Sequence, residues 1–312
     1  SVYITLAILI LIVLSFLSQK ILTKFSLILF LVTFLSLLLV PLIGIEVKGS
    51  KRWLDLFFLP RFQPVEIIKP FFIVTLSLML TIQSRRLYFK YFLSTLFLLP
   101  ILMLLVYQPD IGQTLLITMI WLALIFVSGI NIFIFFVFFL LAGSIVSYLV
   151  IFVPKFEYIK IRLLAFLDSN SGNNYQAEKA SDAIINGGFF GKGIGEGTLN
   201  SRVPEAHTDY IVSVISEEFG AIIVIGILFL YLIFSYKVIQ KINLLNEDTY
   251  KLILIGCISL ILLQTFIHVG VNIRILPTTG MTLPFLSYGG SSIVSTAIVS
   301  GIILNLTKRK LN

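Results

Sequence analysis

Apolar runs about as long as a lipid bilayer is thick recur along the whole chain. A helix needs about 20 apolar residues to cross the hydrocarbon core. Nine such runs lie at roughly 2–17, 25–45, 66–84, 91–107, 112–128, 131–153, 209–236, 251–272 and 287–306. They are continuously apolar rather than alternating, which favours helices over the strands of a barrel. The sequence therefore predicts an all-α polytopic membrane protein with nine transmembrane helices.

Basic residues indicate how these helices are oriented. The connections after the odd-numbered runs and the C-terminal tail carry Lys20, Lys24, Arg85, Arg86, Lys90, Lys237, Lys241, Lys251, Lys308, Arg309 and Lys310. Short cytoplasmic loops are enriched in Lys and Arg, so we expect this side, with the C-terminus, to face the cytoplasm. Ser1 would then lie outside, and we expect that one span precedes it in a ten-span protein.

The opposite side carries two long segments of mixed charge, about 46–66 and 154–208. We predict that they form an outer cap on a single integral membrane domain, 1–312. The net charge of +8 arises mainly on the predicted inner face, so it reports topology and does not indicate nucleic-acid binding. Two histidines, with no H-E-x-x-H pattern, predict no metal site.

The stretch "KGSKRWLDL" places two cations and an aromatic ring in the first outer segment. Lys51 and Arg52 are candidates for binding an anionic substrate, and the alternative is that they extend toward lipid phosphates. Trp53 suits a membrane interface.

Three polar residues at the start of the third apolar run are harder to explain as surface residues. Gln63, Glu66 and Lys69 lie three residues apart, and ionisable groups inside a membrane are candidate functional residues. A structural Glu66–Lys69 ion pair is the alternative. Asp110 begins the fifth run, where it can either contact substrate or cap a helix.

The stretch "VPEAHTDYIVSVISEEFG", residues 203–220, brings charged groups against an apolar run. With a helix that starts at Thr208 or Pro204, Asp209 lies in its first turn and could cap it. The polar side chains continue along one helical face, which comprises Asp209, Ser213, Ser216 and Gly220. We interpret this stripe as the wall of a cavity that opens on the outer surface.

The last outer segment, "LPTTGMTLPFLSYGGSS" at 276–292, is interrupted by Pro and Gly. Irregular backbone at membrane depth is tolerated where it is buried or lines a cavity. Thr279 and Ser287 supply small polar groups, and Arg274 supplies a cation. By contrast, "GFFGKGIGEG" at 188–197 lacks the pattern of a phosphate-binding loop and is interpreted as a lid or tight turn.

Six motifs together resemble the SEDS family of shape, elongation, division and sporulation proteins (FtsW/RodA/SpoVE). They are "KGSKRWL", "FQPVEIIKP", "YQPDIGQTL", "GGFFGKGIGEG", "VPEAHTDYIVSVISEEFG" and "LPTTGMTLPFLSYGGSS", in family order over nearly the whole chain. Within the family, the last two are most similar to FtsW. The resemblance implies a ten-span fold that lacks its first span here, with a large extracytoplasmic loop between spans seven and eight of that fold.

The resemblance also implies an activity. A peptidoglycan glycosyltransferase would polymerise lipid II into β-1,4 glycan strands at the outer face of the cytoplasmic membrane during cell division. It would use an undecaprenyl-pyrophosphate-linked donor with inversion, and would work with a class B penicillin-binding protein transpeptidase and other divisome proteins. Asp209 is the catalytic residue by this resemblance. The expected substrate-binding residues are Lys51, Arg52, Trp53, Gln63, Glu66, Lys69, Asp110, Glu205, His207, Thr208, Arg274, Thr279 and Ser287.

No organic cofactor is expected, although a divalent cation, Mg or Mn, could assist the pyrophosphate. Two alternatives are a lipid II flippase and a non-catalytic division scaffold. A flippase needs ionisable groups that reach both sides of the membrane, whereas the acids of this chain concentrate on the predicted outer half.

The orientation can be tested with reporter fusions. A reporter fused after Asn312 should behave as cytoplasmic, and one inserted near Asn173 as external, because the basic loops set the topology. Accessibility of the two reporters from each side of the membrane is the measurement, and the reverse pattern would overturn the orientation.

Overall fold

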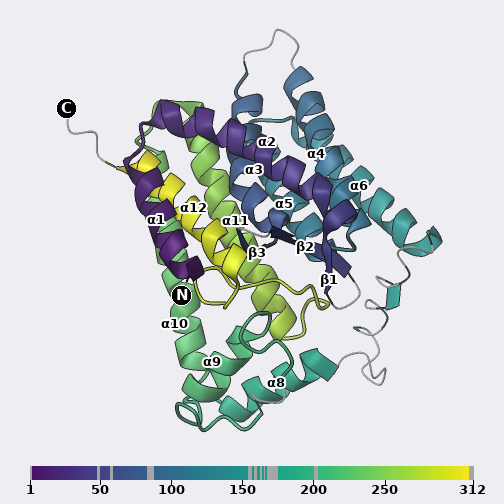
Figure 1. Cartoon of the computed structure of the whole chain (residues 1–312), viewed down its shortest axis with the longest axis vertical. Helices are drawn as coiled ribbons and strands as arrows, with labels where there is room; N and C mark the ends of the chain where they lie inside the picture. Colours follow the sequence, from purple (N-terminus) through teal and green to yellow (C-terminus); the bar gives the residue numbers. More distant parts are fainter. Residues whose placement is uncertain are drawn as a thin grey trace. The chain divides into compact units, whose positions relative to one another are not determined.

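The computed structural model describes residues 2–47, 50–56, 59–82, 88–153, 157, 160, 161, 164, 166, 175–199 and 203–308 (Figure 1). The positions Arg85, Arg86, Asn173, Arg309 and Lys310, and much of the predicted cap segment 154–208, lie outside these residues. Most of the described chain is helical. The helices are α1 (Val2–Phe16), α2 (Gln19–Ile43), α3 (Pro64–Leu80), α4 (Phe89–Tyr107), α5 (Ile111–Val127), α6 (Ile132–Phe152), α8 (Tyr175–Gly187), α9 (Ile211–Phe219), α10 (Ala221–Ile242), α11 (Asp248–Asn272) and α12 (Gly290–Thr307).

Each of the nine predicted runs corresponds to helical structure. Among the described residues, six helices are long and apolar enough to cross a membrane, namely α2, α4, α6, α10, α11 and α12. The apolar helices α1 and α5 are shorter. The prediction of a mainly helical protein with membrane-length helices is therefore confirmed, and the count of nine spans stays a prediction.

The predicted helix at 209–236 is not continuous. The structure ends α9 at Phe219 and begins α10 at Ala221, with Gly220 between them at φ 87° and ψ 167°. A residue with a side chain rarely adopts this backbone conformation. A Cβ at Gly220 would also lie 2.2 Å from the Phe189 carbonyl oxygen. The prediction of one continuous helix is wrong here because the apolar pattern does not reveal that Gly220 breaks the helix where the Phe189 backbone approaches it.

A small antiparallel sheet occupies the segment before α3. It consists of β1 (Ile45–Val47), β2 (Ser50–Leu56) and β3 (Leu59–Phe62), in the order β1-β2-β3. Exposed Lys51 lies opposite Glu46, whereas Leu54, opposite Phe62, is buried. This alternation suits a strand with one covered face. The all-α prediction is therefore wrong for this segment, which is too short and too polar to form another span.

The chain divides into two compact units. The first comprises Ser1–Ile130, Ser235–Ile261 and Gly289–Asn312. Its centre is α3, which is buried on nearly every side and contacts α2, α4, α5 and α12. Helix α1 lies along α12 (Figure 1), where Asn305 Nδ2 donates to the Leu14 and Leu17 carbonyls at 2.8 and 2.7 Å.

The second unit comprises Asn131–Phe234 and Leu262–Tyr288. Helix α8 packs against α9 (Figure 1), and a Cβ at Gly187 would lie 2.0 Å from the Ser216 carbonyl oxygen, so the two helices approach closely there. Helices α10 and α11 each contribute residues to both units. The single-domain organisation stays a prediction beside this division.

The break at Gly220 gives a stability prediction. Gly220→Ala should lower the free energy of unfolding by about 2 kcal/mol or more, because a backbone region open only to glycine costs about 1–3 kcal/mol and the added methyl meets a carbonyl. Thermal unfolding in detergent is the measurement.

Gly226→Ala is the matched control. Gly226 lies within α10, and nothing would contact a Cβ there within 4 Å. Its unfolding temperature should be unchanged or slightly higher, because Ala favours a helix. Equal behaviour of the two variants would contradict the proposed strain.

Candidate functional site

The candidate residues fall into two groups, one in each unit. The first unit holds Lys51, Arg52, Trp53, Gln63, Glu66, Lys69 and Asp110. The second unit holds Glu205, His207, Thr208, Asp209, Arg274, Thr279 and Ser287.

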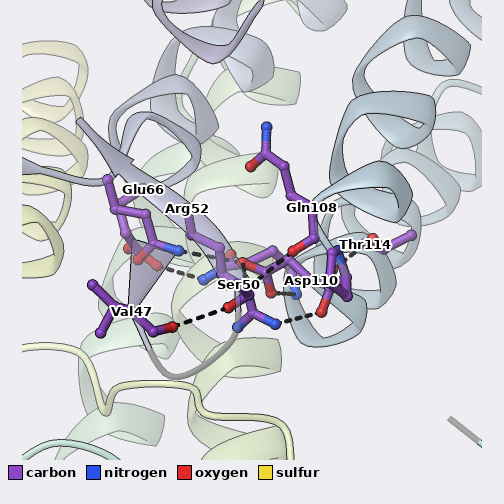
Figure 2. A network of polar contacts seen from close by, with 10 residues as sticks. Val47, Ser50, Arg52, Glu66, Gln108, Asp110 and Thr114 are labelled. Atoms are coloured by element: carbon purple, nitrogen blue, oxygen red, sulfur yellow. Dashed lines mark hydrogen bonds and ion pairs between the residues drawn. The ribbon is translucent and has the colours of Figure 1, made fainter. Parts of the chain in front are cut away.

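In the first unit, Arg52 fastens strand β2 to the end of α4 (Figure 2). Its Nε donates to the Gln108 carbonyl at 3.2 Å, and its Nη2 donates to the Pro109 carbonyl. The same Nε lies 3.8 Å from Asp110 Oδ2. The Arg52 side chain is 23% exposed, so this cation is partly accessible while it holds the backbone.

Asp110 is the N-cap of α5. Its Oδ1 accepts from the Gln113 N–H at 3.4 Å, and its Oδ2 accepts from Gln63 Nε2 at 3.2 Å. The pKa of the Asp110 carboxyl is raised above its usual value, because the effect of burial exceeds the opposing effects of the Arg52 guanidinium and the Gln113 N–H. The capping interpretation of Asp110 is confirmed.

Glu66 and Lys69 form a buried ion pair. Lys69 Nζ lies 2.8 Å from Glu66 Oε2, and the two side chains are 0% and 5% exposed. Gln113 Nε2 donates to the other oxygen of Glu66. The pair expected from the spacing is therefore present, and Gln113 links it to Asp110. This network joins β2, α3 and α5.

Lys51 and Trp53 belong to the same strand but differ in exposure. Lys51 is exposed, and Trp53 is half-buried opposite Ile45. Both residues can meet lipid or substrate, and the two interpretations stay open for them.

In the second unit, a turn precedes α9. Glu205, at φ 58°, accepts at its carbonyl from the Thr208 and Asp209 N–H groups at 3.1 and 3.0 Å. Thr208 Oγ1 donates to Glu205 Oε2 at 3.1 Å. The helix begins at Ile211 with Tyr210 as N-cap. The predicted place of Asp209, in the first helical turn, is therefore wrong because the Glu205 turn delays the helix.

Asp209 is half-buried and its backbone is held in place. Its carbonyl accepts from Asn272 Nδ2 at 3.2 Å. Its Oδ2 lies 3.4 Å from the position that a Cβ on Gly280 would occupy, and Gly280 adopts φ 67°. A glycine with positive φ thus lies beside the carboxylate.

The segment after α11 closes onto the same turn. Ser287 Oγ donates to the Thr208 carbonyl at 2.6 Å and accepts from the Leu283 N–H at 2.8 Å. The Tyr288 N–H donates to the His207 carbonyl at 2.9 Å. The structure therefore brings together Ser287, Thr208 and His207 beside Asp209, with the His207 side chain exposed.

Thr279 and Arg274 lie in the same segment. Among the described residues, no hydrogen-bond partner reaches the buried Thr279 Oγ1, which neighbours Gly280 in the chain. Arg274, at φ 58°, lies 4.0 Å by its Nη2 from Glu178 Oε1 of α8. Its side chain is 31% exposed.

The rest of the predicted polar stripe is buried. Ser213 and Ser216 are covered on α9. Glu217, the adjacent acid, accepts at Oε1 from Asn186 Nδ2, Thr198 N–H and Leu199 N–H at 2.9, 3.0 and 2.9 Å. Glu217 therefore attaches the two ends of the glycine-rich segment to α9, and its Oε1 accepts all three of these hydrogen bonds.

Sequence reasoning missed three polar residues of α11. Gln264, His268 and Asn272 are all buried and bond to the segments beside Asp209. Their spacing of four residues in an apolar run places them on one helical face, and intramembrane polar residues signal a function. That signal was in the sequence.

No group of three or more His, Cys, Asp or Glu side chains suited to a metal occurs in the described part of the chain. An assisting Mg or Mn ion therefore has no ligand set that we can name.

The family model described as a cell cycle protein, FtsW/RodA/SpoVE, matches residues 1–312. A probable peptidoglycan glycosyltransferase FtsW from Coxiella burnetii is 38% identical over 89% of this chain and 77% of its own length. Its counterpart from Caulobacter vibrioides is 35% identical over 86% of this chain and 68% of its own length.

Solved structures agree with these relatives. One similar chain belongs to a solved structure described as structural coordination of polymerization and crosslinking by a peptidoglycan synthase complex. It is 28% identical to this chain, with a TM-score of 0.82 over 98% of this chain and 87% of that chain. The Thermus thermophilus rod shape determining protein RodA is 27% identical, with a TM-score of 0.69 over 98% of this chain and 85% of its own. This chain belongs to the FtsW/RodA/SpoVE family.

The Glu66–Lys69 pair gives a stability prediction. Lys69→Met should lower the free energy of unfolding by about 3–5 kcal/mol, because it leaves a buried carboxylate without its cation. Glu66→Gln with Lys69→Met should recover most of this loss. Chemical or thermal unfolding in detergent measures both variants.

The control is a pair with the same spacing on the surface. Lys251 lies 2.9 Å from Asp248, with side chains 35% and 80% exposed, so Lys251→Met should cost less than about 1 kcal/mol. A Lys69→Met protein as stable as the Lys251→Met protein would show that the buried pair is not structural.

Proposed function

We propose that this chain is a peptidoglycan glycosyltransferase. It polymerises lipid II into β-1,4 glycan strands at the outer face of the cytoplasmic membrane during cell division, with a class B penicillin-binding protein transpeptidase and other divisome proteins. The names of its relatives support the activity. The similar chain from a complex that coordinates polymerization with crosslinking supports the partner.

The reaction that we propose is one inverting displacement. The 4-hydroxyl of the lipid II GlcNAc attacks C1 of the MurNAc at the end of the growing glycan, which is α-linked to undecaprenyl pyrophosphate. The O4–C1 bond forms while the C1–O bond to phosphate breaks, and the pyrophosphate leaves with the electron pair. The hydroxyl proton passes to a carboxylate, and such proton transfer contributes about 10²–10⁴-fold.

Asp209 is the carboxylate that we assign as this base, and its local geometry is the observation that carries the proposal. Its backbone is held by Asn272 while its half-buried carboxylate lies beside a glycine. The other acids that are candidates for the base are almost fully covered, whereas Asp209 is half-buried. Asp110 caps α5, Glu66 pairs with Lys69, and Glu217 accepts three hydrogen bonds.

Cations would stabilise the pyrophosphate as its charge grows. Lys51 is exposed, and Arg52 and Arg274 are partly exposed, so these three are the candidates for this role. Lys69 is fully covered and paired with Glu66. We therefore assign Lys69 to holding the network and not to direct contact with phosphate.

Substitution of Asp209 tests the proposal. Asp209→Asn keeps the size of the side chain and most of its hydrogen bonding but removes the base. Polymerisation of purified lipid II by the full-length protein with its cognate transpeptidase should fall by about 10²-fold or more. Expression, membrane insertion and binding of the transpeptidase should stay nearly intact. Asp209→Glu should retain partial activity, since the longer side chain moves the oxygen atoms.

Asp55→Asn is the matched control. Asp55 also carries a partly exposed carboxylate, which lies 3.5 Å from Arg61. The Asp55→Asn protein should polymerise lipid II at the parent rate. Near-normal turnover of lipid II by the Asp209→Asn protein would remove Asp209 from the mechanism. Glu217, Glu66 or Asp110 would then be the next candidates for the base, whereas a parent protein that does not polymerise lipid II would favour a flippase or a division scaffold.

A further inference from the structure

Three buried polar side chains form a ladder along one face of α11. Gln264, His268 and Asn272 follow one another at intervals of four residues, so they project from the same face. Their exposed fractions are 3%, 1% and 0%. Burying a polar group without a hydrogen-bond partner is costly. The partners of these three side chains therefore identify the segments that the ladder attaches to α11.

The first two members of the ladder hold the segment that follows α11. Gln264 Nε2 donates to the carbonyl and the hydroxyl of Thr282 at 2.9 and 3.2 Å. His268 Nδ1 lies 2.7 Å from the Met281 carbonyl oxygen. Because a carbonyl only accepts, Nδ1 carries the hydrogen in this contact. Residues 281 and 282 are thus fastened to α11.

The third member holds the turn that carries Asp209. Asn272 Nδ2 donates to the Asp209 carbonyl at 3.2 Å and to the His268 carbonyl at 2.8 Å. Asn272 Oδ1 accepts at 3.3 Å from the Ser213 N–H, which also donates to the Tyr210 carbonyl at 3.0 Å near the start of α9. One amide therefore fixes Asp209 and the beginning of α9 to α11.

The two fastened segments meet at the carboxylate. Gly280 directly precedes Met281 in the chain, and a Cβ there would lie 3.4 Å from Asp209 Oδ2. The ladder therefore fixes the backbone of Asp209 on one side and the turn beside its carboxylate on the other.

We propose that this ladder is the positioning device for the Asp209 carboxylate, with Asn272 as its decisive member. The inference rests on the proposed role of Asp209 as the base. The ladder residues do not touch substrate; they act through the position of Asp209. A displacement of about 1 Å can lower a rate about 10²-fold, so a rigid mount for a base that lies in a turn has a direct effect on turnover.

Asn272→Ala tests the proposal in the full-length protein with its transpeptidase partner. The kcat for lipid II polymerisation should fall by about 10-fold or more, with KM within about twofold of the parent value. Loss of folded protein would by itself also lower the apparent kcat at constant KM, so each rate is referred to the amount of folded protein.

Asn305→Ala is the control for buried asparagine. Asn305 is also fully covered, and its amide ties α12 to α1 through the Leu14 and Leu17 carbonyls. The Asn305→Ala substitution should lower the unfolding temperature as Asn272→Ala does, yet leave kcat unchanged. An equal fall in kcat in both variants would overturn the positioning role.

A double-mutant cycle with Asp209→Asn decides the question. If Asn272 acts through the carboxylate, Asn272→Ala should lower kcat little or not at all in the Asp209→Asn background. The same fold-loss in both backgrounds would overturn the proposal. If Asn272→Ala does not fold, Gln264→Met replaces it in the cycle, with an expected loss of about threefold only when Asp209 is present.

The cycle also separates this inference from the proposed function. Loss of activity in Asp209→Asn together with normal kcat in Asn272→Ala overturns the ladder alone. Normal activity in Asp209→Asn overturns the role of Asp209 as the base and the ladder with it, and leaves the glycosyltransferase activity standing.

Discussion

A buried polar atom without a hydrogen-bond partner costs about 1–3 kcal/mol, and a buried charge without a partner costs more. This constraint organises both units. In the first unit, Gln113 joins the Glu66–Lys69 pair to Asp110, so one strand and two helices are held by side chains. In the second, Asn272 performs the corresponding task for the start of α9. Specific polar contacts thus hold these elements to one another.

Two glycines lie where segments of the second unit approach each other closely. Gly220 interrupts an apolar stretch so that the backbone of Phe189 can approach it closely. Gly280 leaves room next to the carboxylate of Asp209. Both adopt positive φ values, which glycine reaches without strain. Asn272 and Gly280 therefore belong to one arrangement at the turn before α9, and Gly220 makes its close approach at the other end of that helix.

The sequence predicted the helices well because long apolar runs leave the backbone few choices in lipid. It also offered the Glu66–Lys69 pair and the cap formed by Asp110 as alternatives to substrate contact, since both depend on spacing within one helix. It failed where distant segments meet. The break at Gly220 depends on Phe189, more than thirty residues earlier.

The ladder of α11 was overlooked for the same reason. The spacing of Gln264, His268 and Asn272 was visible, but their partners lie in segments whose approach no local pattern reveals. Asp209 itself was found through its motif and not through its surroundings. The turn at Glu205 that carries it depends on a positive φ at a residue other than glycine, which a sequence seldom announces.

The contacts of Glu217 have a consequence for local unfolding. A single carboxylate oxygen holds Asn186 and the backbone of Thr198 and Leu199. Between these attachment points the chain displays Phe189, Phe190 and Ile194, which are strongly exposed. Segments that open locally do so at a free energy set by the few contacts that close them. The Thr198 and Leu199 amides share this one acceptor, so their protection against hydrogen exchange should be lost together. The part of the stretch nearer α8 should stay protected longer, because the Lys192 and Gly193 N–H groups donate to the Glu217 and Glu218 carbonyls at 2.8 and 3.0 Å.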